Sequence, residues 1–260
     1  MRIWTLIENT TNLTKLHAEH GLSLYLETET RRILFDTGQS GAFWDNAEAM
    51  GIDLQQVDFA ILSHGHYDHG GGLRRFLEGN SNAPVYLNCH AFSPCFHGPE
   101  RYIGLDPTLQ NESRLHFVDD VFPLGQTMEL RTCNERKRHY KSQSGDLQIL
   151  ENGAYAPDPF LHEQYLLMEE SGKRILFSGC SHKGICNLVH WFSPDVLIGG
   201  FHLSKLDPNG PEIQEIGQVL KESGTQFYTC HCTGSAQYEA LSSMLGQRLT
   251  SLSTGMCVDL

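Results

Sequence analysis

The sequence predicts a mixed α/β protein, and three patterns along the chain lead to this prediction. Short apolar runs recur through the first 90 residues and again after residue 164, as expected for buried strands. Segments with apolar residues three and four positions apart follow the later runs, as expected for amphipathic helices. The third pattern is a polar loop, residues 63–69, which stands between an apolar run and a glycine cluster.

The first half of the chain contains most of the predicted strands, each a short run of apolar and β-branched residues. The expected strand ranges are 3–7, 22–26, 32–35, 59–62 and 85–87. A short helix is expected at Leu73–Glu78, directly after the glycine cluster, where it would pack behind the polar loop.

The second half alternates strands with helices. Residues 164–169 and 175–177 predict a hairpin that turns at Ser171-Gly172. The helix expected at 211–223 begins at a proline and is followed by Gly224, which are typical helix boundaries. The remaining expected elements are helices at 184–192 and 235–245 and strands at 196–198 and 226–229.

The polar loop carries four side chains that can bind metal, His64, His66, Asp68 and His69. Imidazole and carboxylate groups are ligands that borderline divalent metals prefer. Because Phe59–Leu62 predicts a buried strand, the loop should lie at a strand end, where functional residues are often placed. A histidine-rich surface turn is the alternative interpretation, but the spacing of the four residues favours a metal site.

This loop resembles the first metal-binding motif of the metallo-β-lactamase superfamily. Residues 32–38, 174–180 and 228–234 resemble later landmarks of that family in the same order. Within the family, the chain is similar to the branch related to dihydropterin ribofuranosyl-aminobenzene phosphate synthase, in stretches that include Glu19–Ser23 and Gly179–Ile185. The resemblance implies a four-layer αβ/βα sandwich, a single domain over 1–260, with residues 89–163 as a variable insert that faces the substrate.

The resemblance also implies a ligand set. His64 and His66 would bind a first metal, Asp68 and His69 a second, and His231 would be the last ligand. Cys180 stands where most members carry a metal-bridging aspartate, and a thiolate there favours zinc over magnesium or calcium. Alternatively Cys180 faces the core.

Several other polar residues have open roles at this stage. His182 would be a ligand, a group that supports a ligand, or a proton shuttle. The third ligand of the first metal is expected to be His162, with Glu163 and His97 as alternatives. His202 would contact the substrate or cap a sheet edge. The remaining expectations are that Asp36 orients a ligand histidine and that His20 and His90 lie at the pocket wall or on the surface.

By the same resemblance, the expected activity is that of a metal-dependent hydrolase, in which a metal-bound hydroxide attacks an ester, lactone or phosphate-type substrate. Asp68, His182 and His202 are the catalytic candidates. The expected cofactor is one or two divalent metal ions, with zinc ahead of manganese, iron and magnesium. A synthase-like transferase and a di-iron redox or sensing protein are the alternative functions.

Composition limits the partners. The formal net charge of −12 argues against a nucleic-acid partner and leaves a small molecule, possibly anionic, as the expected substrate. The one dense basic run, Arg136–Lys141, would recruit an anion or form a solvated loop. No run approaches the roughly 18 apolar residues of a membrane span, and no signal peptide is visible, so we expect a soluble cytoplasmic protein.

The eight cysteines are expected to be reduced in such a protein. Cys230 and Cys232 flank His231, and in an extended segment both would point away from it.

Overall fold

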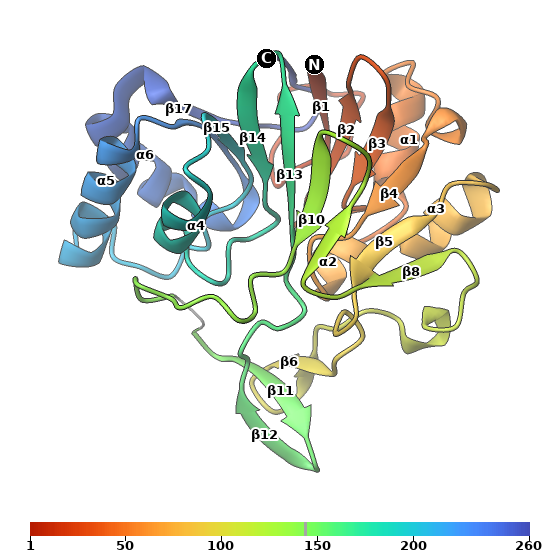
Figure 1. Ribbon diagram of the computed structural model, residues 1–260, viewed down its shortest axis with the longest axis horizontal. Coiled ribbons are helices and arrows are strands. Elements are labelled where there is room, and N and C mark those ends of the chain that lie inside the picture. The colour runs from red at the N-terminus through yellow and green to blue at the C-terminus, as the bar shows by residue number, and fades with distance from the viewer. Residues whose placement is uncertain (143–144) are drawn as a thin grey trace.

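The computed structural model describes residues 1–142 and 145–260. Two large sheets pack face to face, and helices cover the outer face of each (Figure 1). This is the expected four-layer sandwich of the metallo-β-lactamase fold. The apolar runs that predicted strands supply its core, because the runs buried between the sheets must be apolar on the inward side.

The first sheet has the strand order β18-β1-β2-β3-β4-β5-β8. The strands β3, β4, β5 and β8 run parallel, whereas β1 and β2 are antiparallel to their neighbours. Their bounds are β1 Arg2–Ile7, β2 Ser23–Glu27, β3 Arg32–Phe35, β4 Phe59–Ile61, β5 Val85–Asn88, β8 Leu115–Val118 and β18 Cys257–Asp259. Helices α1 (Ala42–Ala49) and α3 (Leu73–Gly79) pack on its outer face.

The second sheet has the strand order β17-β16-β15-β14-β13-β10-β9. Strands β14 to β17 run parallel, and β13, β10 and β9 extend the sheet with antiparallel pairs. Their bounds are β9 Val121–Pro123, β10 Met128–Arg131, β13 Tyr165–Glu170, β14 Lys173–Phe177, β15 Val196–Ile198, β16 Gln226–Thr229 and β17 Leu249–Ser251. Helices α4 (Ile185–Phe192), α5 (Pro211–Ser223) and α6 (Ser235–Leu245) cover it.

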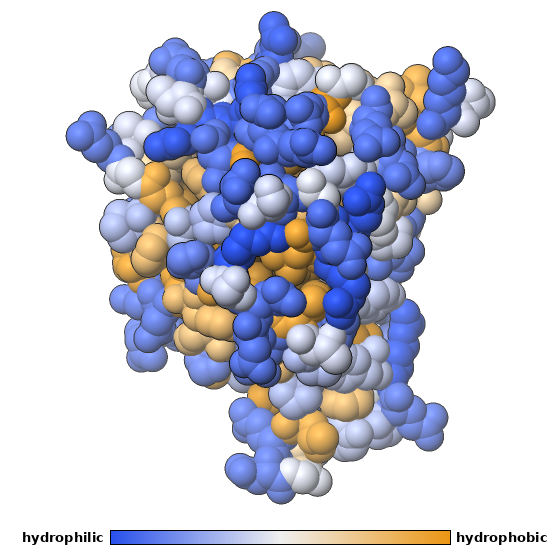
Figure 2. Space-filling model, turned by 90° about the vertical axis from the view of Figure 1, so that its right-hand side faces the viewer, coloured by the Kyte–Doolittle hydropathy of each residue, from blue (hydrophilic) through white to orange (hydrophobic). Residues whose placement is uncertain are grey.

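A third, small sheet projects from the sandwich as a lobe. Its strand order is β12-β11-β6-β7, from Ala154–Pro157, Leu147–Glu151, Cys95–His97 and Arg101–Tyr102. The lobe lies at the bottom of Figure 1, and Figure 2 shows it extending below the main body with apolar side chains among hydrophilic ones. Residues 89–163 are therefore not one insert, because β8, β9 and β10 complete the two large sheets.

The predicted strands of the two large sheets and the predicted helices that cover them are confirmed, and their boundaries differ by at most one or two residues. Helix α1 was not predicted. Its packing face includes Asn46, whose amide is buried and donates to the carbonyl oxygens of Leu6 (2.7 Å) and His17 (2.8 Å). A buried amide interrupts the apolar spacing by which a helix is recognised in a sequence. Among the described residues, no helix is long and apolar enough to cross a bilayer.

The apolar core between the two sheets should contribute strongly to the free energy of unfolding. The buried ring of Phe177 lies in this core and packs against Phe35, with ring centroids 5.8 Å apart. We predict that Phe177→Ala lowers the free energy of unfolding by about 3–5 kcal/mol. Phe117→Ala is the matched control, because that ring is 45% exposed, and it should change the value by about 0.5 kcal/mol or less. Urea unfolding with a chelator present measures both, and equal losses would contradict the prediction.

Candidate metal centre

The candidate site lies where the carboxyl ends of strands from both large sheets meet. Asp36 follows β3, the loop 63–69 follows β4, Cys180 follows β14, His202 follows β15 and His231 follows β16. Parallel strands bring such residues to one edge of a sheet, where ligands usually bind. Helix α2 (Tyr67–Gly70) continues the polar loop and carries Asp68 and His69.

The turns at these strand ends are strained. Asp36, Ser181, His202 and His231 all have left-handed backbones, with φ of 61°, 57°, 53° and 50°. A non-glycine residue in this region costs of order 1–3 kcal/mol, and such residues gather at functional sites. The strain is therefore concentrated at the edge that holds the polar side chains.

The first group of potential ligands is His64, His66 and His182, whose ligand atoms lie within 4.8 Å of one another. All three side chains are buried, and Nε2 of His64 is 3.3 Å from Nε2 of His182. Two nitrogens bound to one tetrahedral zinc at about 2.0 Å would lie about 3.3 Å apart. The spacing therefore fits two ligands of one cation.

The second group is Asp68, His69, Cys180 and His231. Nε2 of His69 lies 3.2 Å from Sγ of Cys180, and Nε2 of His231 lies 3.2 Å from Oδ2 of Asp68. The same carboxylate oxygen is 3.3 Å from Nε2 of His20. This mixture of imidazole, carboxylate and thiol fits a borderline divalent cation.

Outer hydrogen bonds hold the ligand rings with Nε2 facing inward. His69 Nδ1 donates to Asp36 Oδ2 (2.7 Å), as expected for a carboxylate that orients a ligand histidine. His64 Nδ1 lies 2.9 Å from Ser63 Oγ, which itself donates to Asp36. His231 Nδ1 donates to Asn9 Oδ1 (2.8 Å). Such partners hold a proton on Nδ1 and aim Nε2 at the position that a metal would take.

Electrostatics also favours neutral rings in the first group. Burial, together with the neighbouring imidazoles, lowers the pKa of His66 to about 3 and the pKa values of His64 and His182 well below their usual range. Neutral imidazole is the form that binds metal. His69 differs: burial opposes its charge, but the pair with Asp36 raises its pKa to about 9.

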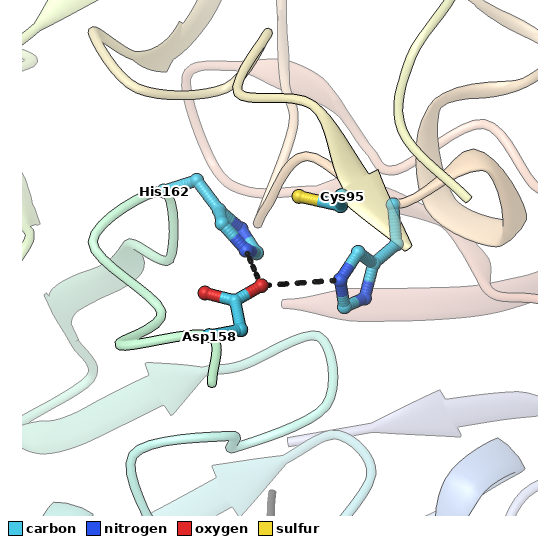
Figure 3. Close-up of side chains that lie close together, drawn as sticks. Cys95, Asp158 and His162 are labelled. Atoms are coloured by element: carbon cyan, nitrogen blue, oxygen red, sulfur yellow. Dashed lines mark hydrogen bonds and ion pairs between the residues drawn. The ribbon is translucent and has the colours of Figure 1, made fainter. Parts of the chain in front are cut away.

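His162 lies behind this site rather than in the first group. Its Nδ1 accepts a hydrogen bond from the amide of Gly65 (3.1 Å), and its Nε2 donates to Asp158 Oδ2 (3.0 Å). Both nitrogens therefore have partners within the described residues. The potential ligand atoms of His162 group with those of His66, Cys95 and Asp158, whereas those of His182 group with His64 and His66. Figure 3 shows His162 and Asp158 facing each other beside the thiol of Cys95.

Asp158, which has no role in the sequence analysis, hydrogen-bonds to His162 and lies close to His66. The buried Nε2 of His66 makes no hydrogen bond within the described residues and lies 4.0 Å from Asp158 Oδ2. The hydrogen bond of that carboxylate oxygen goes to His162, so Asp158 would act on the His66 ring by its charge alone and favour a proton on Nε2. No local pattern near residue 158 indicates this role, because Asp158 and His66 lie far apart in the sequence and meet only in the folded protein.

Glu163, the first alternative for the third ligand, also has a different position. Its carboxylate accepts the backbone amides of His182 (2.7 Å) and Lys183 (3.0 Å), so it fixes the turn that presents His182. Lys183 is buried, and its Nζ donates to the carbonyl of Thr132 (2.6 Å) and to Asn134 Oδ1 (2.8 Å). His97, the other alternative, lies on the cavity wall.

A cavity of about 520 Å³ opens onto both groups. The half-buried His202 lines it, with its ring centroid 4.3 Å from that of His182. The wall combines apolar side chains with the cations Arg101 and Lys205. Other residues that line the cavity, outside the two groups of potential ligands, include Tyr67, His97, Arg101, Ile103, Leu147 and Lys205.

The basic run Arg136–Lys141 is not part of this wall. Arg136 packs on α4, where it donates to the carbonyl of Trp191 (3.0 Å) and lies over the ring of Phe192. Arg138 donates to the carbonyl of Pro159. His90 is also absent from the described lining of the cavity, whereas His20 contributes to it.

Comparison with known proteins shows the family of this fold. Residues 18–132 match the model of the metallo-beta-lactamase superfamily. The fold superposes on the crystal structure of Tm1679, described as a metal-dependent hydrolase of the beta-lactamase superfamily, with a TM-score of 0.87, 30% identity and coverage of 100% of this chain and 99% of that one. The chain belongs to the metallo-β-lactamase superfamily.

Two curated relatives in this superfamily come from Methanocaldococcus jannaschii. One is an uncharacterised protein, 28% identical over 92% of this chain and 93% of its own length. The other is a 7,8-dihydropterin-6-methyl-4-(beta-D-ribofuranosyl)-aminobenzene-5'-phosphate synthase, 29% identical over 90% of this chain and 88% of its own length. The predicted branch is therefore supported by similarity along nearly the whole chain.

The support that Asp158 gives to His66 is open to test. We predict that Asp158→Asn lowers the affinity for zinc about 10- to 100-fold, because the amide no longer holds the proton on Nε2 by charge. Asp45→Asn, on the exposed side of α1, is the matched control and should leave the affinity unchanged. Competition with a chelating dye measures both, and unaltered zinc binding in Asp158→Asn would refute the assignment.

Zinc affinity should also depend on pH through His69. Its pKa of about 9 means that the ring holds a proton that zinc must displace at lower pH. We predict that affinity rises with pH by about tenfold per unit for each displaced proton, and that the contribution of His69 ends above about pH 9. Calorimetry in buffers of different ionisation enthalpy measures the released protons, and affinity independent of pH would contradict the prediction.

Proposed function

We propose that this protein is a metal-dependent hydrolase that acts on a small anionic ester, lactone or phosphate-type substrate. One observation carries the proposal: both groups of potential ligands contribute side chains to a single cavity whose wall also carries cations. Similarity to Tm1679, described as a metal-dependent hydrolase, over 99% of that chain supports the reaction class.

The residues fit two divalent cations. His64, His66 and His182 would hold the first, and Asp68, His69, Cys180 and His231 the second. Zinc suits the set best, because a thiolate is a soft ligand. Divalent metals bound here would polarise an acyl or phosphoryl oxygen and lower the pKa of water.

The protein's own groups would then position the substrate and move protons. His202 is the proton donor to the leaving group in this proposal, because it lines the cavity with its ring beside that of His182. His182 is engaged with the first metal in this assignment. Asp68 uses Oδ2 towards His20 and His231, so Oδ1 is available to orient the attacking water.

Arg101 and Lys205 would bind the anionic part of the substrate from the opposite wall. Arg101 is held at the cavity by a hydrogen bond to the hydroxyl of Tyr67 (2.9 Å) and by its position over that ring. Lys205 is exposed and forms no ion pair with any described residue. An anion between them would gain charge-assisted hydrogen bonds.

A second candidate is a synthase-like transferase, because the Methanocaldococcus jannaschii synthase is similar over 90% of this chain. Formation of such a product would release diphosphate, which harder cations such as magnesium usually assist, and Cys180 disfavours those cations. A di-iron redox or sensing protein would use the same ligand frame, and visible absorbance of the purified protein would identify it.

The reaction class is tested with zinc-loaded protein and a panel of aryl phosphodiesters, esters and lactones. We predict turnover that is lost on chelation, is restored by zinc, and falls at least about 100-fold in His202→Ala if that residue donates the proton. No turnover of any substrate, together with tight binding of a pterin and synthase activity with magnesium, would replace the hydrolase by the transferase.

The role of Arg101 predicts a specific kinetic change. Arg101→Ala should raise KM for an anionic substrate about tenfold with little change in kcat, because one charge-assisted hydrogen bond of roughly 1.5 kcal/mol is lost. Arg74→Ala is the control, since that side chain pairs with Asp106 and is absent from the described cavity lining. A neutral isostere should show no such effect, and equal losses on both substrates would exclude anion recognition by Arg101.

A further inference from the structure

We propose that Cys232 is a second thiolate ligand, which with Cys180 and His231 makes the second metal site thiolate-rich and selective for zinc. The inference rests on the proposed metal-dependent function. The ligand atoms of these three residues lie within 4.8 Å of one another, and all three side chains are buried. Two thiols and an imidazole at this spacing are a set typical of zinc sites.

The backbone turns Cys232 towards the site. In an extended strand both cysteines beside His231 would face away from it, but the strand β16 ends at Thr229 and residues His231–Thr233 form a 3₁₀ turn. His231 has φ of 50°, which reverses the chain direction locally. As a result Cys230 packs into the core between the sheets, whereas Cys232 lines the cavity.

The surroundings of Cys232 Sγ are built to hold a sulfur atom. The backbone amide of His202 donates to it at 3.3 Å, and amide donors to sulfur support a thiolate ligand. Gly200 leaves the space that the sulfur occupies, because a Cβ at position 200 would clash with it. The Cys232 thiol lies 3.6 Å from the carbonyl oxygen of Cys180, and the side chains of Cys180 and His202 are also within hydrogen-bond reach of its sulfur.

Two thiolates change what the second site selects. Cys180 and Cys232 together would supply two negative charges, which match the charge of a divalent cation. Thiolates favour zinc over manganese and magnesium, which prefer oxygen ligands. Cys180, which replaces the family's bridging aspartate, would therefore supply one thiolate ligand of this site, and Cys232 would supply the other.

Cobalt(II) is the probe, because a cobalt–thiolate bond gives a near-ultraviolet charge-transfer band whose strength increases with the number of thiolates. The full-length protein is loaded with cobalt in a phosphine reductant, and the band is measured per bound cobalt. We expect the band to fall by about half in Cys232→Ser and in Cys180→Ser, and to vanish in the double variant. Cys230→Ser, on the same segment but in the core, should keep the full band.

A second readout uses the unmutated protein. Cadmium-113 resonances move downfield with each thiolate, so one of the two bound cadmium ions should show the shift of a two-thiolate site. The preference for zinc over manganese should fall at least about tenfold in Cys232→Ser. The cadmium measurement does not depend on whether a variant folds well, and neither measurement depends on finding a substrate.

The outcomes separate the two proposals. An unchanged cobalt band in Cys232→Ser, or a one-thiolate cadmium shift in the unmutated protein, would overturn the role of Cys232 and leave the metal-dependent hydrolase standing. Failure of the unmutated protein to bind cobalt, cadmium or zinc would overturn both. A halved band with no hydrolysis of any substrate would support Cys232 and reject the hydrolase.

Discussion

The candidate metal centre depends on the hydrogen bonds of one buried carboxylate, that of Asp36. Its Oδ1 accepts the amide of Ser63 (2.7 Å), and its Oδ2 accepts the hydroxyl of Ser63 (2.7 Å) and Nδ1 of His69 (2.7 Å). One group therefore joins the end of β3 to the beginning of the ligand loop and to α2. A buried carboxylate without these partners would be strongly unfavourable, so the loop and the strand ends are fixed together.

The same principle organises the rest of the site. Several inward-facing groups have a partner on a different segment: Asn9 holds His231, the buried Glu163 holds the turn at His182, and the buried Asp158 lies 4.0 Å from His66. These partners come from distant parts of the chain, so the two sheets must pack correctly before the ligands meet. The packing of the sheets therefore determines both the left-handed turns at the strand ends and the orientation of the potential ligands.

Much of the fold could be predicted from the sequence, because buried strands and amphipathic helices leave local patterns. The grouping of His64, His66, Asp68 and His69 was visible for the same reason. Asp158 was not visible, and Glu163 was expected only as an alternative ligand, because the observed roles of both depend on contacts between segments far apart. His162 has the residue type and approximate position of a ligand, but only the hydrogen bonds to Gly65 and Asp158 reveal that both nitrogens are occupied.

The small lobe has a consequence for how this architecture can diversify. The large sheets supply the potential ligands, whereas β7 and the start of β11 supply Arg101 and Leu147 to the cavity wall. A new lobe would therefore alter which molecules fit while leaving the centre intact. Exchange is limited at one point: Asp158 follows β12 directly and faces His66, so any replacement must return a carboxylate to that histidine.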